Sequence, residues 1–182
     1  FTLDLNGLYQ TKNLRTILCA EGILMQQGFT IKNEAEKSAL ANTKKLTGLH
    51  GRWDIIAQHP AIVLDVAHNE DGMKQIIGQL ALINDNNAKI HFVMGMVKDK
   101  EVSKVLSLLP ADAVYYFTNA HIPRALPATE LQSKAAAYNL QGNCFDDVNE
   151  AIAAAKQKAA TTDLIIVCGS VFLVGEVEFT SG

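Results

Sequence analysis

The sequence predicts an α/β protein in which a mostly parallel, Rossmann-like sheet carries helices on both faces and follows a shorter helical segment. From about residue 52 onward, strand-like and helix-like segments alternate, as they do in βαβ units. Several strand-like segments are uninterrupted apolar runs, such as Leu164-Ile165-Ile166-Val167, which is typical of parallel strands covered on both faces. Polar side chains follow four of these strands, at the edge where open α/β sheets place their ligands.

The first fifty residues show helical patterns without strands. A first helix is expected to open at Asn13 and to end at Gly28, with an apolar face made of Leu14, Ile17, Leu18, Leu24 and Met25. Asn33 and Glu36 resemble a capping box for a second helix over about 34–46. The inward side of this second helix is expected to hold Ala35, Ala39, Leu40 and Leu46.

A domain boundary is expected near residues 47–51, where Gly48 and Gly51 flank a short polar connector. Residues 1–50 would belong to a first, incomplete domain, and residues 51–182 would form a second domain. Within the second, the pattern predicts strands at about 53–57, 62–66, 89–94, 113–118, 142–145 and 163–168. The helices between them are expected at about 69–83, 100–109, 128–138 and 148–160.

Composition narrows the function classes. The 182 residues are 48% hydrophobic and 19% charged, and their net charge of −3 offers no basic surface for nucleic acid. No apolar run is long enough to span a membrane, and Phe1 to Asp4 do not form a signal peptide. The cysteines are three and far apart, and the histidines lack metal-ligand spacing, so we expect reduced thiols, a cytoplasmic location and no zinc site.

Four strand ends carry the residues that could do chemistry. Asp65, His68 and Asn69 follow one strand, and Gly95 with Lys98 and Asp99 follows the next. Further along the chain come Asn119 with His121, and finally Gly169-Ser170. Since a parallel sheet brings these ends to one edge, we expect a single site there. Neither GxGxxG nor GxxxxGK[ST] occurs, so the chain would supply at most half of a nucleotide site.

Six motifs together resemble the C-terminal part of folylpolyglutamate synthase, which in many bacteria is also dihydrofolate synthase and belongs to the Mur ligase superfamily. They are Tyr9-Gln10-Thr11-Lys12-Asn13, His50-Gly51-Arg52-Trp53, Leu64-Asp65-Val66-Ala67-His68-Asn69, Gly95-Met96-Val97-Lys98-Asp99-Lys100, Arg124-Ala125-Leu126-Pro127 and Cys168-Gly169-Ser170. The resemblance covers essentially the whole chain. It implies that residues 1–50 are the tail of a central ATPase domain and that 51–182 are the C-terminal glutamate-ligase domain.

The resemblance also implies an activity. Such enzymes use MgATP to convert a folate or pteroate carboxylate into an acyl phosphate, which the amino group of L-glutamate then attacks. Holding both reactants away from water protects this intermediate, and a cleft between two closing domains does so. The phosphate loop, the magnesium ligands and the folate-binding loops would lie upstream of Phe1. We therefore expect a monomer whose isolated chain is inactive, with ATP, magnesium, L-glutamate and folate or dihydropteroate as its ligands.

The resemblance assigns roles to five residues. Asn13 would contact the nucleotide base, Arg52 the ATP phosphates, and Asp65 the ribose or the hinge region. Arg52 suits the phosphates because its planar guanidinium stabilises charge that develops during phosphoryl transfer. His68 and Ser170 would lie near the incoming glutamate, where an imidazole or a hydroxyl can orient the amine and carboxylates.

Plainer interpretations remain for four of these residues. Arg52 could be a surface arginine after a linker, Asp65 and Asn13 could be helix caps, and His68 could be an ordinary loop residue. Glu70 departs from the family, which usually has proline there, and its charge would oppose an anion bound at the following helix.

Three other functions compete. A Mur ligase that acts on a peptidoglycan precursor is disfavoured because those enzymes commonly carry Tyr where Val66 stands and a His-Asn pair where this chain has Tyr9-Gln10. A non-catalytic α/β ligand-binding module would show no MgATP turnover with any folate. A stand-alone dehydrogenase is the weakest alternative, because the glycine fingerprint is missing.

Overall fold

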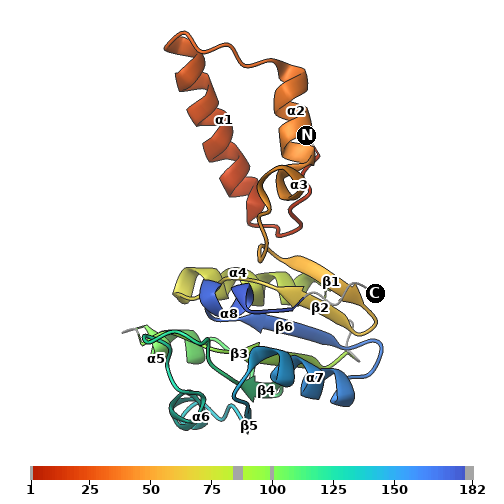
Figure 1. Cartoon of the computed structure of the whole chain (residues 1–182), viewed down its shortest axis with the longest axis vertical. Coiled ribbons are helices and arrows are strands. Elements are labelled where there is room, and N and C mark those ends of the chain that lie inside the picture. Colours follow the sequence, from red (N-terminus) through yellow and green to blue (C-terminus); the bar gives the residue numbers. More distant parts are fainter. Residues whose placement is uncertain (1, 84–87, 99–100, 179–182) are drawn as a thin grey trace. The chain divides into compact units, whose positions relative to one another are not determined.

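The computed structural model describes residues 2–83, 88–98 and 101–178, and the chain separates into two compact units. One unit ends at Asp54 and the other begins at Ile55, slightly beyond the boundary expected at residues 50–51. Each unit is described by itself below. Figure 1 shows helices alone in the first unit and a sheet flanked by helices in the second.

The first unit contains α1 (Gln10–Gln26), α2 (Asn33–Ala41) and α3 (Thr43–Thr47). Helix α1 ends as predicted at Gly28, whose φ of 95° lies in the left-handed region that favours glycine. There the Gly28 N–H donates to the Met25 carbonyl and the Phe29 N–H to the Leu24 carbonyl, which is the Schellman pattern of helix termination.

Three expectations for this unit are wrong. Helix α1 begins at Gln10, so Asn13 lies inside the helix and does not cap it. The capping box is absent as well, because α2 begins at Asn33 itself and its N-cap, Lys32, makes no side-chain cap hydrogen bond. The expected second helix is broken at Asn42, and of its expected inward side chains only Leu40 is buried, while Leu46 is 65% exposed.

The second unit is built on one six-stranded sheet with the order β1-β2-β6-β3-β4-β5. The pairs β2–β6, β6–β3, β3–β4 and β4–β5 are parallel. Edge strand β1 joins its neighbour β2 through a two-residue turn, a connection that suits antiparallel neighbours. The strands are β1 (Asp54–Gln58), β2 (Ala61–Leu64), β3 (Ile90–Met94), β4 (Val114–Phe117), β5 (Gly142–Cys144) and β6 (Leu164–Cys168).

Helices cover both faces of this sheet, so the predicted fold class is confirmed. Helix α7 packs against β3, β4 and β6, and α8 packs against β6. The helices are α4 (Glu70–Ile83), α5 (Val102–Leu106), α6 (Ala128–Ala136), α7 (Val148–Lys158) and α8 (Val171–Gly175). Helix α5 is shorter than expected, α6 ends before Tyr138, and α8 was not predicted.

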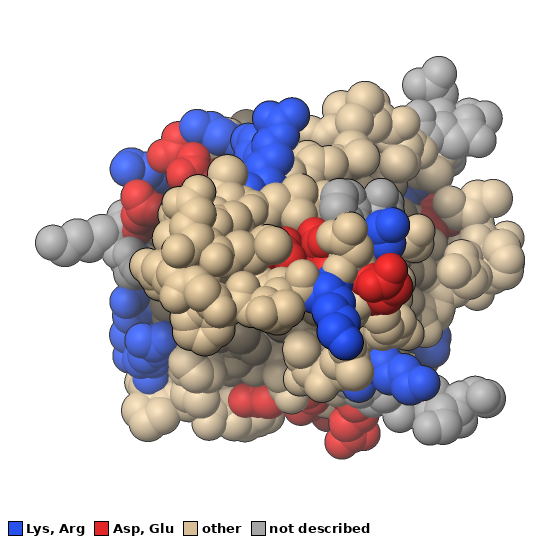
Figure 2. Space-filling view, turned by 90° about the horizontal axis from the view of Figure 1, so that it is seen from above, with Lys and Arg blue, Asp and Glu red and all other residues tan. Residues whose placement is uncertain are grey.

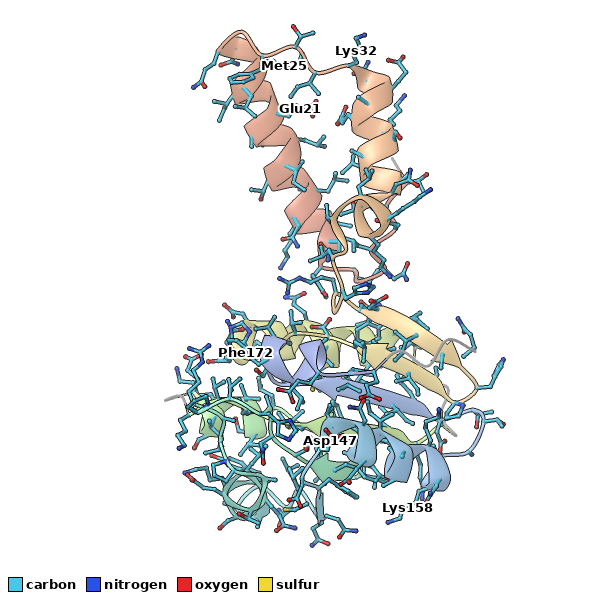
Figure 3. The ribbon with its side chains drawn as sticks, in the orientation of Figure 1. Glu21, Met25, Lys32, Asp147, Lys158 and Phe172 are labelled. Carbon is cyan, nitrogen blue, oxygen red and sulfur yellow. The ribbon has the colours of Figure 1, made fainter. Side chains whose placement is uncertain are left out.

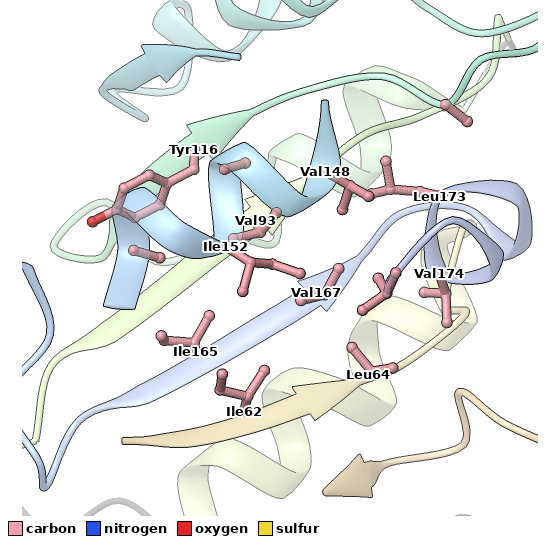
Figure 4. Packing of buried hydrophobic residues seen from close by; sticks show 14 of the residues in the cluster. Ile62, Leu64, Val93, Tyr116, Val148, Ile152, Ile165, Val167, Leu173 and Val174 are labelled. Atoms are coloured by element: carbon pink, nitrogen blue, oxygen red, sulfur yellow. The ribbon is translucent and has the colours of Figure 1, made fainter. Parts of the chain in front are cut away.

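The core follows from the two-residue alternation of the strands. Side chains such as Ile62, Val93 and Val167 form one cluster with the inward face of α7 and with α8 (Figure 4). The alternate positions hold Phe92, which stacks on Tyr115 with 5.5 Å between the ring centroids. These apolar layers keep the sheet rigid, and a rigid sheet fixes the positions of the loops at its edges.

The described surface mixes the two charge signs. On the face shown in Figure 2, Lys and Arg side chains alternate with Asp and Glu side chains among uncharged residues. In the part of the chain that the structure describes, no helix is long and apolar enough to cross a membrane.

Candidate active site at the carboxyl edge of the sheet

The four polar strand ends lie at one edge of the sheet, as the parallel arrangement requires. Leu64 pairs with Val167, and Met94 pairs with both Cys168 and Phe117, so β2, β6, β3 and β4 end together. Hydrogen bonds continue beyond the strands, because the Gly169 N–H donates to the Ala67 carbonyl over 2.9 Å. The loops after β2 and β6 are thus held side by side.

Asp65 is fixed at the end of β2. Its side chain is buried, and its Oδ1 accepts a hydrogen bond from the Ala67 N–H over 2.9 Å. This local turn, an Asx turn, orients the carboxylate before the helix begins. Since α4 begins only at Glu70, Asp65 is not a helix cap.

His68 offers one ring nitrogen to the surroundings. Its Nδ1 lies 3.0 Å from the Val66 carbonyl oxygen, which can only accept, so Nδ1 carries a proton. In the neutral ring Nε2 then carries the lone pair. Because His68 is exposed, its Nε2 can accept a hydrogen bond from an amine.

Asn69 caps helix α4. Its Oδ1 accepts from the Gly72 N–H over 2.9 Å, and its backbone carbonyl accepts from the Met73 N–H. A Cβ at Gly72 would lie 3.0 Å from the Ala67 Cβ, so a side chain there would require its neighbours to shift. The cap therefore brings the start of α4 close against the loop that carries His68.

Glu70 is paired with lysines. Its Oε1 accepts a hydrogen bond from Lys74 Nζ over 2.6 Å, and its Oε2 lies 3.8 Å from Lys104 Nζ. The hydrogen bond from Lys74 holds the pKa of this exposed carboxyl below its usual value. Pairing with two cations weakens the repulsion that its charge would exert on a bound anion.

Ser170 is buried at the start of α8, where its Oγ accepts from the Phe172 N–H over 3.1 Å. The Gly169 before it has a φ of 106°, and a Cβ there would lie 2.5 Å from the Gly95 carbonyl oxygen. A side chain at Gly95 would in turn lie 2.8 Å from the Thr118 carbonyl oxygen. These two glycines let three loops approach closely, which explains why both follow strands at this edge.

The loop after β4 is held by polar contacts. The Glu176 carboxylate receives a hydrogen bond from the His121 backbone N–H over 2.7 Å and lies 2.9 Å from His121 Nδ1. Asn119 Oδ1 accepts from the Ala128 N–H. Of the loop after β3, Lys98 is exposed and Asp99 lies outside the described residues.

The loop after β4 also carries a positively charged residue, Arg124. The Arg124 guanidinium carbon is 4.7 Å from the centroid of the Phe172 ring. Phe172 lies on α8, two residues after Ser170 (Figure 3). In the sequence, Arg124 stood out only as part of a motif. Its contact with Phe172 could not be predicted, because residues so far apart in the chain leave no local pattern.

The remaining two candidate residues belong to the first unit. Asn13 is exposed on α1, and its Nδ2 donates to Gln10 Oε1 over 2.7 Å. Arg52 is exposed in the segment that joins α3 to β1. The structure thus brings Asp65, His68 and Ser170 together within one unit, while Asn13 and Arg52 lie in the other.

Residue types limit what this chain can bind. Among the described residues, no group of three or more His, Cys, Asp or Glu side chains could hold a metal ion. The Cys168 thiol is also poorly suited to chemistry, because burial raises its pKa far above the ordinary value, as does the nearby Asp65 charge.

Comparisons with known proteins agree with this geometry. Residues 51–171 match the family described as Mur ligase, glutamate ligase domain. The dihydrofolate synthase/folylpolyglutamate synthase of Escherichia coli (strain K12) is 28% identical over 166 residues, which cover 91% of this chain and 36% of that protein.

Solved structures of related enzymes also resemble this chain. Escherichia coli FolC in complex with DHPP and ADP matches with a TM-score of 0.70 and 27% identity, covering 85% of this chain and 36% of that one. A bifunctional folylpolyglutamate synthase/dihydrofolate synthase with Mn, AMPPNP and L-glutamate bound also matches with a TM-score of 0.70, at 29% identity and the same two coverages. The chain spans about a third of the length of these relatives.

Proposed function

We propose, from the premise that this chain belongs to the Mur ligase family through its glutamate ligase domain, that it is part of an ATP-dependent ligase that adds L-glutamate to folates or dihydropteroate. The observation that carries the proposal is that the family match includes the strand-end loops holding Asp65, His68 and Ser170. The relatives named above, two of them with a nucleotide bound, support the same reaction class.

In this proposal the first fifty residues are the tail of a central ATPase domain. Helix α1 supports it, because Ile17, Ile23 and Met25 are each at least half exposed, as expected of a surface that packs on further protein. The segment that follows carries Arg52, whose guanidinium would bind the ATP phosphates and stabilise the charge that develops during phosphoryl transfer. Asn13 would contact the base, and Asp65 the ribose.

Glutamate binding would use the carboxyl edge of the sheet. His68 Nε2 would accept a hydrogen bond from the incoming amine, or take its proton as the amide forms. The Ser170 hydroxyl, whose oxygen accepts from Phe172, still has a proton to donate to a carboxylate. The chain's part of the reaction is therefore to bind and orient the glutamate and to move one proton from its amine.

Nucleotide and metal fit the described residues differently. An exposed arginine that directly follows Gly51 suits a phosphate, but the described residues offer no metal-ligand cluster. ATP would therefore contact this chain, whereas the magnesium ligands would come from other parts of the enzyme.

The test is a steady-state assay of the full-length protein that contains this chain. It would receive MgATP and L-glutamate with dihydropteroate, with tetrahydrofolate or with a muramoyl-peptide precursor. ADP formation that requires glutamate and one of the two pteridine substrates would support the proposal. Turnover of the muramoyl-peptide alone would replace it with the peptidoglycan reaction, and no turnover would leave the non-catalytic binding module.

A further inference from the structure

The segment that joins α3 to β1 has an unusual backbone. Gly48 and Gly51 have positive φ values of 67° and 76°, and Trp53 has a φ of 51°. For a bulky aromatic residue this left-handed conformation is strained, and it persists only where the surroundings impose it. Arg52 lies between two of these residues, so whatever imposes the conformation also sets the direction of its side chain.

Asp54 is the group best placed to impose it. The Asp54 side chain is only 6% exposed, and its Oδ1 accepts a short hydrogen bond and ion pair from Lys44 Nζ on α3. Its Oδ2 lies 2.9 Å from His50 Nδ1, and the Gly51 backbone N–H also donates to the carboxylate. One carboxylate therefore binds α3 and the residues just before Arg52, while Asp54 itself directly follows Trp53 in the chain.

The contact between Asp54 and Lys44 is itself held in place, and the Asp54 carboxylate is charged. The Lys44 backbone N–H donates to Asp4 Oδ2 over 2.7 Å, which ties α3 to the start of the chain. Burial acts to raise the pKa of Asp54, but the hydrogen bonds from Lys44, His50 and Gly51 outweigh it and leave the pKa below its usual value. The carboxylate is therefore ionised at neutral pH, as its pairing with Lys44 requires.

We infer that Asp54 is a positioning residue, which holds Gly51-Arg52-Trp53 in one conformation and thereby presents the Arg52 guanidinium. The consequence for catalysis rests on the phosphate role proposed for Arg52. The claim that Asp54 fixes the conformation of residues 51–53 does not depend on that role. All of the contacts that it rests on lie within the first unit, to which Lys44, His50, Gly51 and Asp54 belong. In a flexible linker, the Arg52 side chain would have to be brought into position during each turnover. In a linker held by Asp54, the side chain is already in position before the substrates bind.

Trp53 provides a direct readout, because it is the sole tryptophan of the chain and is 3% exposed. We expect Asp54→Asn to shift its fluorescence emission to longer wavelength and to increase its quenching by acrylamide. Lys44→Met should act in the same direction, since it removes the partner of Asp54. The matched control is Lys45→Met, the exposed neighbour on α3, which should leave the emission unchanged.

Folding must be separated from positioning. Far-UV circular dichroism and urea unfolding identify variants that have lost the fold. If Asp54→Asn unfolds, the inference is tested at Lys44 instead, where Lys44→Arg keeps the positive charge. Folded Asp54→Asn and Lys44→Met proteins with unchanged Trp53 emission and quenching would overturn the inference. Restoration of the original emission by Lys44→Arg, but not by Lys44→Met, would support it.

The catalytic consequence is tested by a double-mutant cycle in the full-length enzyme. If Asp54 acts through Arg52, Asp54→Asn lowers kcat in the wild-type background but has little further effect when Arg52→Ala is already present. Fully additive losses would overturn the positioning role. A harmless Arg52→Ala would instead disprove the phosphate proposal, while the Trp53 readout would still decide the conformational part.

Discussion

Asp65, Asn69 and Ser170 each accept a hydrogen bond from a backbone N–H two or three residues further along the chain. Capping and ligand binding are therefore compatible at this edge, because a carboxylate or hydroxyl oxygen can accept more than one hydrogen bond. His68 differs, since its Nδ1 lies against the Val66 carbonyl oxygen and its Nε2 is left at an exposed position. At the scale of residues, His68 and Arg52 are the side chains most open to a ligand.

Arg52→Ala in the full-length enzyme should lower kcat/KM for ATP-dependent glutamate addition by about 10²–10³-fold, the usual cost of removing one group that stabilises transition-state charge. The thermal unfolding midpoint should change little, because Arg52 is exposed. Arg15→Ala, another exposed arginine of the first unit, serves as the control and should keep its activity. Near wild-type turnover by Arg52→Ala would remove the phosphate role.

Asp163 should make stability depend on pH. It is buried, and although burial acts to raise its pKa, hydrogen bonds from the Lys89 and Ala160 N–H groups and from His91 hold that pKa below the ordinary 3.8. A depressed folded-state pKa contributes stability above the unfolded value, and this contribution disappears as the pH falls through the folded-state value.

The measurement compares wild type with Asp163→Asn by urea unfolding at several pH values. At pH 7 the variant should be less stable by about 1–3 kcal/mol, because buried N–H groups lose an acceptor. The difference should begin to shrink below about pH 3.8, where the carboxyl of the unfolded chain becomes protonated, and should go on shrinking until the pH has passed the lower folded-state pKa. A difference that stays constant down to pH 3 would show that the carboxylate charge is not involved.

At the scale of elements, helix termini follow local chemistry where a single residue decides the outcome. Gly28 ends α1 as its sequence indicates, and Asp147 caps α7 by accepting hydrogen bonds from the Asn149 and Glu150 N–H groups. Lys158 lies at the opposite end of α7 (Figure 3), where a cation complements the helix dipole. Asn33 and Glu36 failed as a capping box because the helix begins one residue too early for Asn33 to act as its N-cap.

Removing the cap of α7 should therefore weaken the second unit. Asp147→Ala is expected to lower the free energy of unfolding by about 1 kcal/mol, since two N–H groups lose their acceptor. Asp146→Ala, the exposed neighbour that caps nothing, is the matched control. Equal destabilisation by the two variants in chemical denaturation would show that charge rather than capping is responsible.

At the scale of the whole molecule, the chain corresponds to about a third of its ligase relatives, and it lacks a phosphate loop. We expect the isolated 182-residue chain to fold but to show no ATP-dependent addition of glutamate to a folate. The reason is that the chain spans only about a third of these relatives and contains no phosphate-loop pattern of its own. A coupled ADP assay with mass spectrometry of the folate products would check this, and glutamylated product would contradict it.

The sequence alone determined the fold class, most strands and the common edge of the candidate residues. Apolar runs, two-residue alternation and βαβ order are local patterns, and a parallel sheet converts them into one site edge without further information. The family resemblance came from six short motifs in order. These features survive small errors in element boundaries, which is why a shortened α5 and an unpredicted α8 did not affect them.

Tertiary structure decided which side chains meet. The hydrogen bonds of Asp54 to Lys44, the pairing of His121 with Glu176 and the stacking of Arg124 on Phe172 join residues 10, 55 and 48 positions apart. The left-handed Trp53 likewise has no local signal, because no propensity favours it. Contacts of this kind depend on the packing of whole elements, and packing depends on the folded chain rather than on any single stretch of sequence.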